Sequence, residues 1–474
     1  MTPAARISLT AAEIAAVTGG RVISGDPARR IDRWSIDTRS IAPGDMFVAI
    51  RGERFDGREF VAAALAAGAA GAVVAAGGTV LSGAGQAGPA PLVIEVADTT
   101  RALQDAGREV RRRSGAKVIA ITGSAGKTTT KEITAELLSA KYTVFRNRGN
   151  LNNHIGVPLS LLELGTRPDV AVIELGMNHA GEIRTLVGLA EPDVRVWTNV
   201  GDAHAGFFAS VDAIADAKAE VLEGAGPNDL LVWNADDERI RARTGGFAGR
   251  ILTFGLSADA DVRASLIEDR GLDGVAATIT TPGGEARIES PLLGTGNLLN
   301  LLAGTAIATD LGIPLREVAD RARLMKPAAH RGELLRLPGG VTLLDDSYNS
   351  SPAALERVLE TVKTAGGSAR KIAILGEMLE LGAHATRLHE RAGRAAAATG
   401  LDLLITVGGD AAREMASAAA TAGMNAASVI YTTNSAEAAD LAAKRVRPGD
   451  LVLVKGSHGI RVDVVVERLK VEFA

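Results

Sequence analysis

Short apolar runs rich in Val, Ile and Leu alternate along the chain with stretches of helical length. Residues 118–121, 371–375, 401–407 and 450–454 are such runs, and each leads into glycine or polar residues. Uninterrupted apolar runs between helices are typical of parallel strands that are covered on both faces. The pattern predicts an α/β protein with its functional loops at the carboxyl ends of the strands.

The same pattern divides the chain into three predicted domains. Residues 1–113 form a small α/β domain that ends in an amphipathic helix with a basic terminus. Residues 114–326 form a central domain with a parallel-rich sheet, and residues 327–474 form a dinucleotide-fold-like domain in which strands alternate with helices. No G-x-G-x-x-G follows any strand of the last domain, so we do not predict a nicotinamide site there.

The central domain opens with KVIAITGSAGKTTTK, which predicts a strand, a glycine-rich loop and a helix in succession. Two residues separate the loop glycines, where the usual phosphate loop has four. An ordinary glycine turn beside a surface lysine is the alternative, but Lys-Thr-Thr-Thr at a helix start favours a loop that binds a nucleoside triphosphate and Mg²⁺. The nucleotide-binding residues of this motif are Gly123, Ser124, Ala125, Gly126, Lys127, Thr128 and Thr129.

Other polar residues are ambiguous when each is considered alone. Glu174 ends an apolar run and is predicted to lie beside the loop as a Mg²⁺ ligand, or to be a surface acid at a strand end. His204 is more often a packed or capping histidine, and Lys218 a solvated helix lysine. Two further groups are predicted to bind a polar ligand, although an Asp-Thr-Arg loop is often only a turn. These groups are Asn152 with Asn153, and Ser35 with Asp37, Thr38 and Arg39.

Composition restricts the possible functions. The net charge of −4, the pI near 6.1 and the 3% of aromatic residues argue against a nucleic-acid surface, so the bound nucleotide is expected to be a small molecule. The chain has no cysteine, which excludes disulfides and thiolate metal sites and fits a reducing compartment. It shows no secretory signal and no run of membrane-spanning length, so we expect a cytoplasmic protein without membrane insertion.

Taken in order, several of these residues resemble the Mur ligases of bacterial cell-wall synthesis, over the whole length of the chain. The resemblance rests on the short phosphate loop, Glu174, His204, Lys218, the helix with Asn297 and Asn300, and Arg331. Residues 345–352, DDSYNSSP, together with 150–153 and 54–57, are similar to the branch that handles a dipeptide. Two positions differ from the family pattern. Ala125 replaces a usual Asn, and Gly296 stands where a His often precedes the first helix Asn.

The resemblance implies a three-domain ligase that uses ATP and Mg²⁺ to join D-alanyl-D-alanine to UDP-N-acetylmuramoyl-tripeptide through an acyl phosphate. It also implies that Lys218 is carbamylated and thereby becomes an anionic metal ligand. The implied catalytic residues are Lys127, Lys218 and His204, and the implied metal ligands are Thr128, Glu174, His204 and Lys218. Further implied nucleotide contacts are Asn297, Asn300, Arg331 and Asp346. The implied substrate-binding residues are Ser35, Asp37, Thr38, Arg39, Asn152, Asn153, Tyr348 and Asn349.

Other activities remain open at this stage. A sister ligase that adds a single amino acid typically carries Asp-Asn-Pro in its last domain, and this tripeptide is absent here. A folylpolyglutamate synthase-like ligase would share the chemistry but would lack a uridine-nucleotide-binding first domain, and a P-loop regulatory switch would need no amine acceptor. We expect a monomer. The sequence leaves open whether the tripeptide ends in meso-diaminopimelate or lysine.

Overall fold

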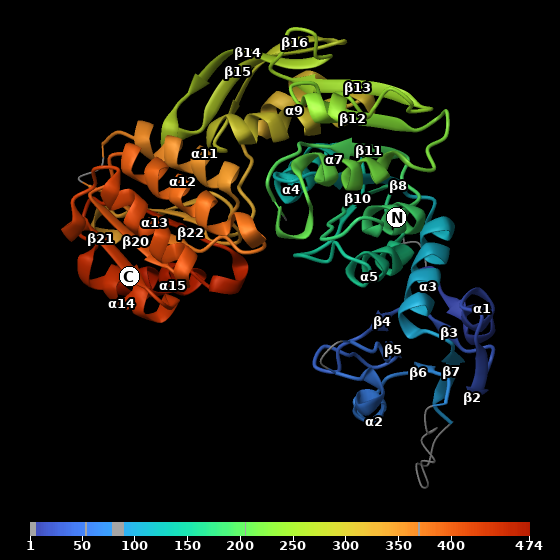
Figure 1. The fold of residues 1–474 in the computed structure, drawn as a ribbon. Coiled ribbons are helices and arrows are strands. Elements are labelled where there is room, and N and C mark those ends of the chain that lie inside the picture. Colours follow the sequence, from blue (N-terminus) through green and yellow to red (C-terminus); the bar gives the residue numbers. More distant parts are fainter. Residues whose placement is uncertain (1–5, 53–54, 78–89, 204, 368–369) are drawn as a thin grey trace.

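A computed structural model describes residues 6–52, 55–77, 90–203, 205–367 and 370–474. The chain forms three successive α/β units, each built on its own sheet, and the α/β prediction is confirmed. The first unit, in blue, and the last, in orange to red, lie on different sides of the central unit (Figure 1). No helix within these described ranges is long and apolar enough to cross a membrane.

The first sheet has five strands, and all but one of its pairings are parallel. Its order is β2 (Arg21–Ser24), β7 (Leu92–Val96), β6 (Gly71–Ala75), β5 (Met46–Val48) and β4 (Trp34–Ser35). A separate pair of short strands consists of β1 (Leu9–Thr10) and β3 (Arg30–Ile31). The helices are α1 (Ala11–Val17), α2 (Val61–Ala66) and α3 (Thr99–Ser114). Leu103 and Val110 of α3 are buried in the core of this unit, so α3 covers its sheet.

Helix α1 begins with a capping box. The Thr10 hydroxyl accepts from the Glu13 backbone N–H, while a Glu13 carboxylate oxygen lies 2.7 Å from the Thr10 backbone nitrogen. The second Glu13 oxygen accepts from Arg113 of α3 at 2.9 Å. The hydrogen bond from the Thr10 backbone, followed by that from Arg113, lowers the pKa of Glu13 to about 2. The first and third helices are thereby joined through one carboxylate.

The central sheet has nine strands, of which seven are joined by parallel pairings and the last two, β15 and β16, are added by antiparallel pairings. Its order is β16 (Gly284–Ser290), β15 (Val275–Thr281), β14 (Val262–Asp269), β13 (Arg250–Gly255), β12 (Leu230–Asn234), β11 (Val194–Trp197), β8 (Lys117–Thr122), β10 (Val170–Glu174) and β9 (Val144–Arg146). The helices are α4 (Lys127–Leu138), α5 (Gly156–Glu163), α6 (Glu182–Ala190), α7 (Val211–Ala219), α8 (Glu238–Arg241), α9 (Gly294–Asp310) and α10 (Leu315–Ala322).

Strand β8 explains why its apolar run is continuous. Ile119 and Ile121 belong to a core on one face of the sheet that includes α4 and α9, whereas Val118 and Ala120 belong to a core on the other face that includes α5 and α6. Successive side chains of a strand point to opposite faces, so burial on both faces removes the polar alternation. In the sheet register, Glu174 of β10 pairs with Ile121, which brings the carboxyl ends of β8 and β10 side by side.

The last sheet has five parallel strands and one antiparallel edge strand. Its order is β17 (Glu333–Arg336), β18 (Thr342–Asp346), β22 (Leu451–Lys455), β19 (Lys371–Gly376), β20 (Leu403–Val407) and β21 (Val429–Thr432). The helices are α11 (Pro352–Thr364), α12 (Ala385–Ala398), α13 (Asp410–Thr421), α14 (Ser435–Arg445) and α15 (Asp463–Glu472). Asp346 and Lys455 are register partners at the carboxyl ends of β18 and β22.

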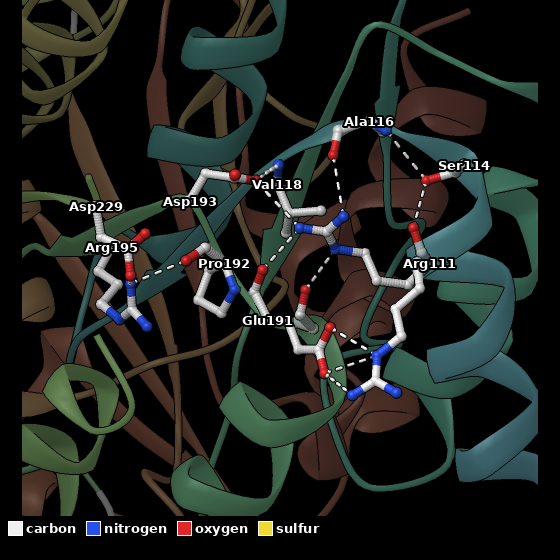
Figure 2. Close-up of polar contacts among 11 residues, drawn as sticks. Arg111, Ser114, Ala116, Val118, Glu191, Pro192, Asp193, Arg195 and Asp229 are labelled. Atoms are coloured by element: carbon white, nitrogen blue, oxygen red, sulfur yellow. Dashed lines mark hydrogen bonds and ion pairs between the residues drawn. The ribbon is translucent and has the colours of Figure 1, made fainter. Parts of the chain in front are cut away.

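A buried arginine fixes the end of α3 to the central unit. Figure 2 shows the Arg111 guanidinium surrounded by backbone carbonyls. It donates to the carbonyl oxygens of Ala190 at 2.7 Å, Ala116 at 3.2 Å and Glu191 at 2.7 Å, and to the Asp193 carboxylate at 3.1 Å. Burial lowers the pKa of Arg111, and Asp193 opposes this effect. Helix α3 therefore belongs to the core of the first unit and is also bonded to the loop before β11.

A glycine contact joins the central and last units on another side. Gly206, in the short helix η3 (Ala205–Phe207), donates its backbone N–H to the carbonyl oxygen of Glu380 at 2.8 Å. A Cβ on Gly206 would lie 2.7 Å from the Gly382 nitrogen, at the start of η7 (Gly382–His384). A distance this short leaves no room for a side chain, so this contact requires glycine at position 206.

Candidate active site

The loop between β8 and α4 has the backbone shape that its sequence predicts. Gly123 has φ +151° and Gly126 has φ +79°, and both values lie where residues with a side chain are strained. A Cβ on Gly126 would also lie 2.4 Å from the Asn300 Oδ1 atom of α9. Helix α4 begins at Lys127, so its free N–H groups and the positive end of its dipole are directed at the loop. This geometry is suited to binding phosphate oxygens.

Residues that follow strand β11 hold the phosphate loop in place through hydrogen bonds. Asn199 accepts from the Ala125 backbone N–H at 2.8 Å and donates to the Ala125 carbonyl at 2.9 Å. The Ser124 hydroxyl accepts from the Gly201 N–H at 2.9 Å. These bonds hold the loop backbone in place before any ligand binds, and pre-organisation of this kind reduces the entropy that binding must overcome.

Lys127 lies inside the loop rather than on the surface. Its Nζ donates to the carbonyl oxygen of Gly123 at 2.7 Å, which folds the side chain back over the loop. Burial lowers the pKa of Lys127, the Glu174 carboxylate raises it, and Arg331 lowers it further. The alternative of a surface lysine beside an ordinary glycine turn therefore does not describe this side chain. A cation above a cradle of N–H groups is the arrangement expected of a phosphate site.

Thr128 and Glu174 form a pair of oxygen donors beside the loop. The Thr128 hydroxyl donates to the Glu174 carboxylate at 2.6 Å, and the side-chain amide of Asn152 donates to the other carboxylate oxygen at 2.8 Å. Glu174 is 3% exposed. Its position at the end of β10 is the predicted one, and a surface acid is excluded. Hydroxyl and carboxylate oxygens are the ligands that Mg²⁺ prefers.

Lys218 of α7 is also buried, with only 1% of its surface exposed. Burial, followed by the charge of Lys127, lowers the pKa of Lys218 well below the usual range of a lysine. No hydrogen bond or ion pair within the described residues involves its Nζ. The alternative of a solvated helix lysine is therefore wrong. His204 lies outside the described residues, and the remainder contains no group of three or more His, Asp or Glu side chains arranged to hold a metal.

One pocket of about 870 Å³ contains the loop and extends to the last unit. Of the residues that the sequence assigns to a site, the pocket is lined by Ser124, Ala125, Gly126, Lys127, Thr128, Thr129, Asn152, Asn153, Glu174, Asn297, Asn300, Arg331, Asp346, Tyr348 and Asn349. Strand ends from two sheets therefore meet at a single site, as the parallel pattern predicts.

The wall contributed by the last unit combines aromatic and charged groups. The Arg331 guanidinium lies 4.1 Å from the ring centre of Tyr348, and the His458 ring stacks on Tyr348 with centroids 5.5 Å apart. Lys455, which is 3% exposed, forms an ion pair with Asp346 at 2.6 Å and donates to the Asn349 carbonyl at 2.9 Å. This pair fixes Asp346 at the end of β18.

A buried carboxylate determines the path of the chain through Arg331. Asp345 is fully buried and accepts from the His330 ring at 2.7 Å and from the Ser347 hydroxyl at 2.6 Å. His330 has φ +61°, which is uncommon for a residue with a side chain, and its carbonyl accepts from the Tyr348 N–H at 3.1 Å. Both flanking segments of the Arg331 site are thereby tied to one carboxylate.

Some predicted residues lie elsewhere. Ser35, Asp37, Thr38 and Arg39 form a turn in the first unit and do not line the pocket. The Arg39 guanidinium pairs with Asp37 at 2.6 Å, and the hydrogen bonds from Arg39 lower the pKa of Asp37 to about 2. Sequence reasoning missed Asn199 and Lys455 as site residues. Lys455 ends β22 and Asn199 follows the end of β11, so proximity to the carboxyl end of a parallel strand was the available signal.

Comparison with family models supports one relationship along most of the chain. Residues 121–308 match the Mur ligase middle domain, and residues 330–458 match the model described as Mur ligase, glutamate ligase domain. Residues 30–105 match the model described as Mur ligase family, catalytic domain. The three matches follow the order of the three sheets.

Relatives and solved structures agree with these matches. UDP-N-acetylmuramoyl-tripeptide–D-alanyl-D-alanine ligase from Synechocystis is 35% identical, over 94% of this chain and 93% of the relative. The enzyme of that name from Bacillus subtilis is 31% identical, over 91% and 92%. The MurF crystal structure from Acinetobacter baumannii has a TM-score of 0.85 at 30% identity, covering 98% of this chain and 99% of the other. MurF ligase from Thermotoga maritima in complex with ADP has a TM-score of 0.79 at 29% identity, covering 93% and 97%. The short phosphate loop, the Thr128–Glu174 pair and these matches lead to one conclusion: the chain belongs to the Mur ligase family.

Proposed function

We propose that this protein is an ATP-dependent ligase that joins the amine of D-alanyl-D-alanine to the terminal carboxylate of UDP-N-acetylmuramoyl-tripeptide. The observation that carries the proposal is the Thr128–Glu174 pair beside Lys127, in a pocket that also contains the Tyr348–Asn349 loop. Relatives named for this reaction are similar over more than nine-tenths of the chain. We further propose that the enzyme is cytoplasmic and monomeric.

The reaction proceeds in two displacements. The tripeptide carboxylate attacks the γ-phosphorus of ATP, which forms an acyl phosphate and releases ADP. The dipeptide amine then attacks the acyl carbon, the phosphate leaves, and the amine loses a proton. In the first step two anions must approach each other, so positive charge between them lowers the barrier. Lys127 supplies one such charge, and the N–H groups at the start of α4 supply further donors.

The residues beside the loop fit a Mg²⁺ ion. The Thr128 hydroxyl and the Glu174 carboxylate are hard oxygen donors already 2.6 Å apart, and Asn152 orients the carboxylate from the other side. When bound, Mg²⁺ neutralises charge on the phosphate and carboxylate groups. Thr128, Glu174, His204 and a carbamylated Lys218 would hold it. Asn152 and Asn199 keep the surrounding backbone and side chains in position.

Carbamylation of Lys218 would explain why a lysine is buried here without an acidic partner among the described residues. The ammonium first loses one proton, and the neutral amine then adds CO₂ to form a carbamate and releases a second proton, so a buried cation becomes a buried anion. An anion close to Lys127 is favoured electrostatically, whereas two ammonium groups repel each other. Enrichment with ¹³C-bicarbonate should give a carbamate signal in the ¹³C NMR spectrum of the wild type and none in Lys218→Ala. Identical spectra would rule out the modification.

The choice of acceptor is the direct test of the proposed reaction. D-alanine, meso-diaminopimelate and D-alanyl-D-alanine should be offered together with ATP and each UDP-linked tripeptide, and the products read by mass. The acceptor amine must come within about 3–3.5 Å of the acyl carbon, and a dipeptide holds its carboxylate one residue farther from that amine. Preferred ligation of a single amino acid would assign the chain to a sister activity.

The matched variant for this test is Lys127→Ala, with Lys141→Ala as its control. Lys141 follows the same helix α4, and its Nζ donates to the Leu311 carbonyl outside the pocket. Lys127→Ala should abolish ligation while its circular dichroism spectrum stays that of the wild type, and Lys141→Ala should retain activity. A folded Lys127→Ala variant with near wild-type turnover would contradict the phosphate role.

Folylpolyglutamate synthase from Mycobacterium tuberculosis, at 15% identity, shares the fold alone.

A further inference from the structure

An arginine from the last unit occupies space beside the start of α9 in the central unit. A Cβ on Gly296 would lie 3.2 Å from Nε and 3.3 Å from Cδ of Arg357, which belongs to α11. One turn further along α11, the Thr361 hydroxyl lies 3.3 Å from the Cβ position of Gly294. Gly294 and Gly296, in the first turn of α9, therefore receive side chains from the opposing helix, and Arg357 fills the place that a larger residue 296 would take.

The Arg357 guanidinium has no partner in the described part of the chain. No hydrogen bond, ion pair or aromatic contact involves it there, although Asp346 and Glu356 attract it electrostatically. Two arginines of the neighbouring helix α12 differ in this respect, since Arg391 pairs with Glu356 and Arg394 with Glu390. Arg357 lines the pocket and its side chain is exposed, so its five N–H donors are available to a ligand.

The position of Arg357 along the pocket indicates which part of a nucleotide it meets. Asn300 touches the phosphate loop at Gly126 and donates to Asn297, one turn earlier in α9. Gly296 immediately precedes Asn297 and, at the usual rise per residue, lies about 6 Å from Asn300 along the helix axis. A nucleotide with its phosphates on the loop therefore extends along the first turns of α9 toward Arg357. The group that reaches it is the nucleoside end.

We propose that Arg357 binds the purine ring of the nucleotide from the last unit, in the space that Gly296 leaves open. This inference rests on the proposed use of ATP. A planar guanidinium stacks on aromatic rings and donates in their plane, which suits a purine better than a compact ammonium does. The base is then held between α9 of the central unit and α11 of the last unit, so nucleotide binding joins the two units.

The test compares Mg-ADP with Mg-tripolyphosphate, which carries the phosphate chain without a base. Isothermal titration should show that Arg357→Ala raises the Kd for Mg-ADP about tenfold, which is the size expected for one desolvated cation–ring contact. The Kd for Mg-tripolyphosphate should stay within about twofold of the wild-type value. Arg357→Lys should restore less than half of the loss. Arg394→Ala, on the neighbouring helix α12 and outside the pocket, should bind both ligands like the wild type.

Each outcome decides the inference. Equal loss for ADP and tripolyphosphate, or full rescue by lysine, would overturn it, because a charge acting on phosphates would then suffice. Wild-type affinity in a folded Arg357→Ala variant would also overturn it and leave the proposed ligase intact. A wild type that binds neither ligand would instead refute the proposed function. In a double-mutant cycle, the single variant Gly296→Ala should have a lower affinity for ADP than the wild type, because its Cβ displaces Arg357. The same substitution should cause no further loss of affinity in the Arg357→Ala background.

Discussion

Replacing Arg111 by alanine is expected to lower the free energy of unfolding by about 3–4 kcal/mol. The guanidinium donates to three carbonyls and one carboxylate at 2.7–3.2 Å. The three carbonyls lose this donor, whereas the Asp193 carboxylate keeps the backbone N–H of Val118. Each buried acceptor without a partner costs about 1 kcal/mol or more, and removing one member of a buried ion pair costs about 3–5 kcal/mol. The Asp193 side chain is 41% exposed and can regain water. The expected loss of unfolding free energy therefore lies in the lower part of the range for a broken buried ion pair.

The adjacent residue provides a matched control. Arg112 binds the Glu191 carboxylate through two nitrogens, but its side chain is 54% exposed. Exposed ion pairs are worth about 0–1 kcal/mol, so Arg112→Ala should change stability little. The two variants remove the same type of side chain from the same helix turn and differ in burial.

Urea unfolding followed by tryptophan fluorescence is the appropriate assay. Trp197 and Trp233 are buried on β11 and β12, so their emission reports the central sheet to which Arg111 is bonded. A chain with three units need not unfold in one step, so the transition of this sheet should be analysed by itself. Equal losses in the two variants, or a loss below about 1 kcal/mol for Arg111→Ala, would refute the reasoning from buried acceptors.

Three further predictions follow from contacts in the fold. The hydrogen bond from the Thr10 backbone lowers the pKa of Glu13 from its usual 4.5 to about 2, so this carboxylate adds stability above pH 4.5 that is lost as the pH falls toward 2. Glu13→Gln should be less stable than the wild type at neutral pH, and its stability should change less between pH 4.5 and 2 in an acid titration followed by circular dichroism. Gly206→Ala should raise the radius of gyration in X-ray scattering and the KM for ATP, because its Cβ does not fit the opposing backbone, whereas Gly226→Ala, with open space around it, should do neither. His330→Ala should raise the KM for ATP about tenfold with kcat little changed, because Arg331 loses its support, and His330→Asn should recover most of the loss since Asn accepts a positive φ; a similar effect of both variants would contradict this positioning role.

The sequence was sufficient for the sheet type and for the residues around the phosphate loop. Apolar runs without polar alternation predicted parallel strands, and the strand ends then had to share one edge. Glu174 was placed beside the loop on this basis, and the Thr128–Glu174 hydrogen bond agrees with that placement. Lys218 required the family resemblance, because a lysine on an amphipathic helix carries no local sign that it is buried.

Contacts between units were not predictable from local patterns. The packing of Arg357 on Gly296 joins helices of two different units, and nothing near either residue in the sequence specifies it. The Lys455–Asp346 pair likewise depends on the order of strands within the last sheet, in which β22 lies next to β18. Strand order follows from tertiary packing, whereas strand existence follows from the local run of apolar residues.

The glycine contact at residue 206 also affects how the junction between the central and last units responds to its surroundings. The atoms that meet Gly206 there are backbone atoms of Glu380 and Gly382, and one backbone hydrogen bond joins the two segments. Such a bond contributes about 1 kcal/mol and has no titratable or ionic component. Ionic strength and pH therefore have little direct effect on this hydrogen bond, and they act on the junction between the two units only through other contacts.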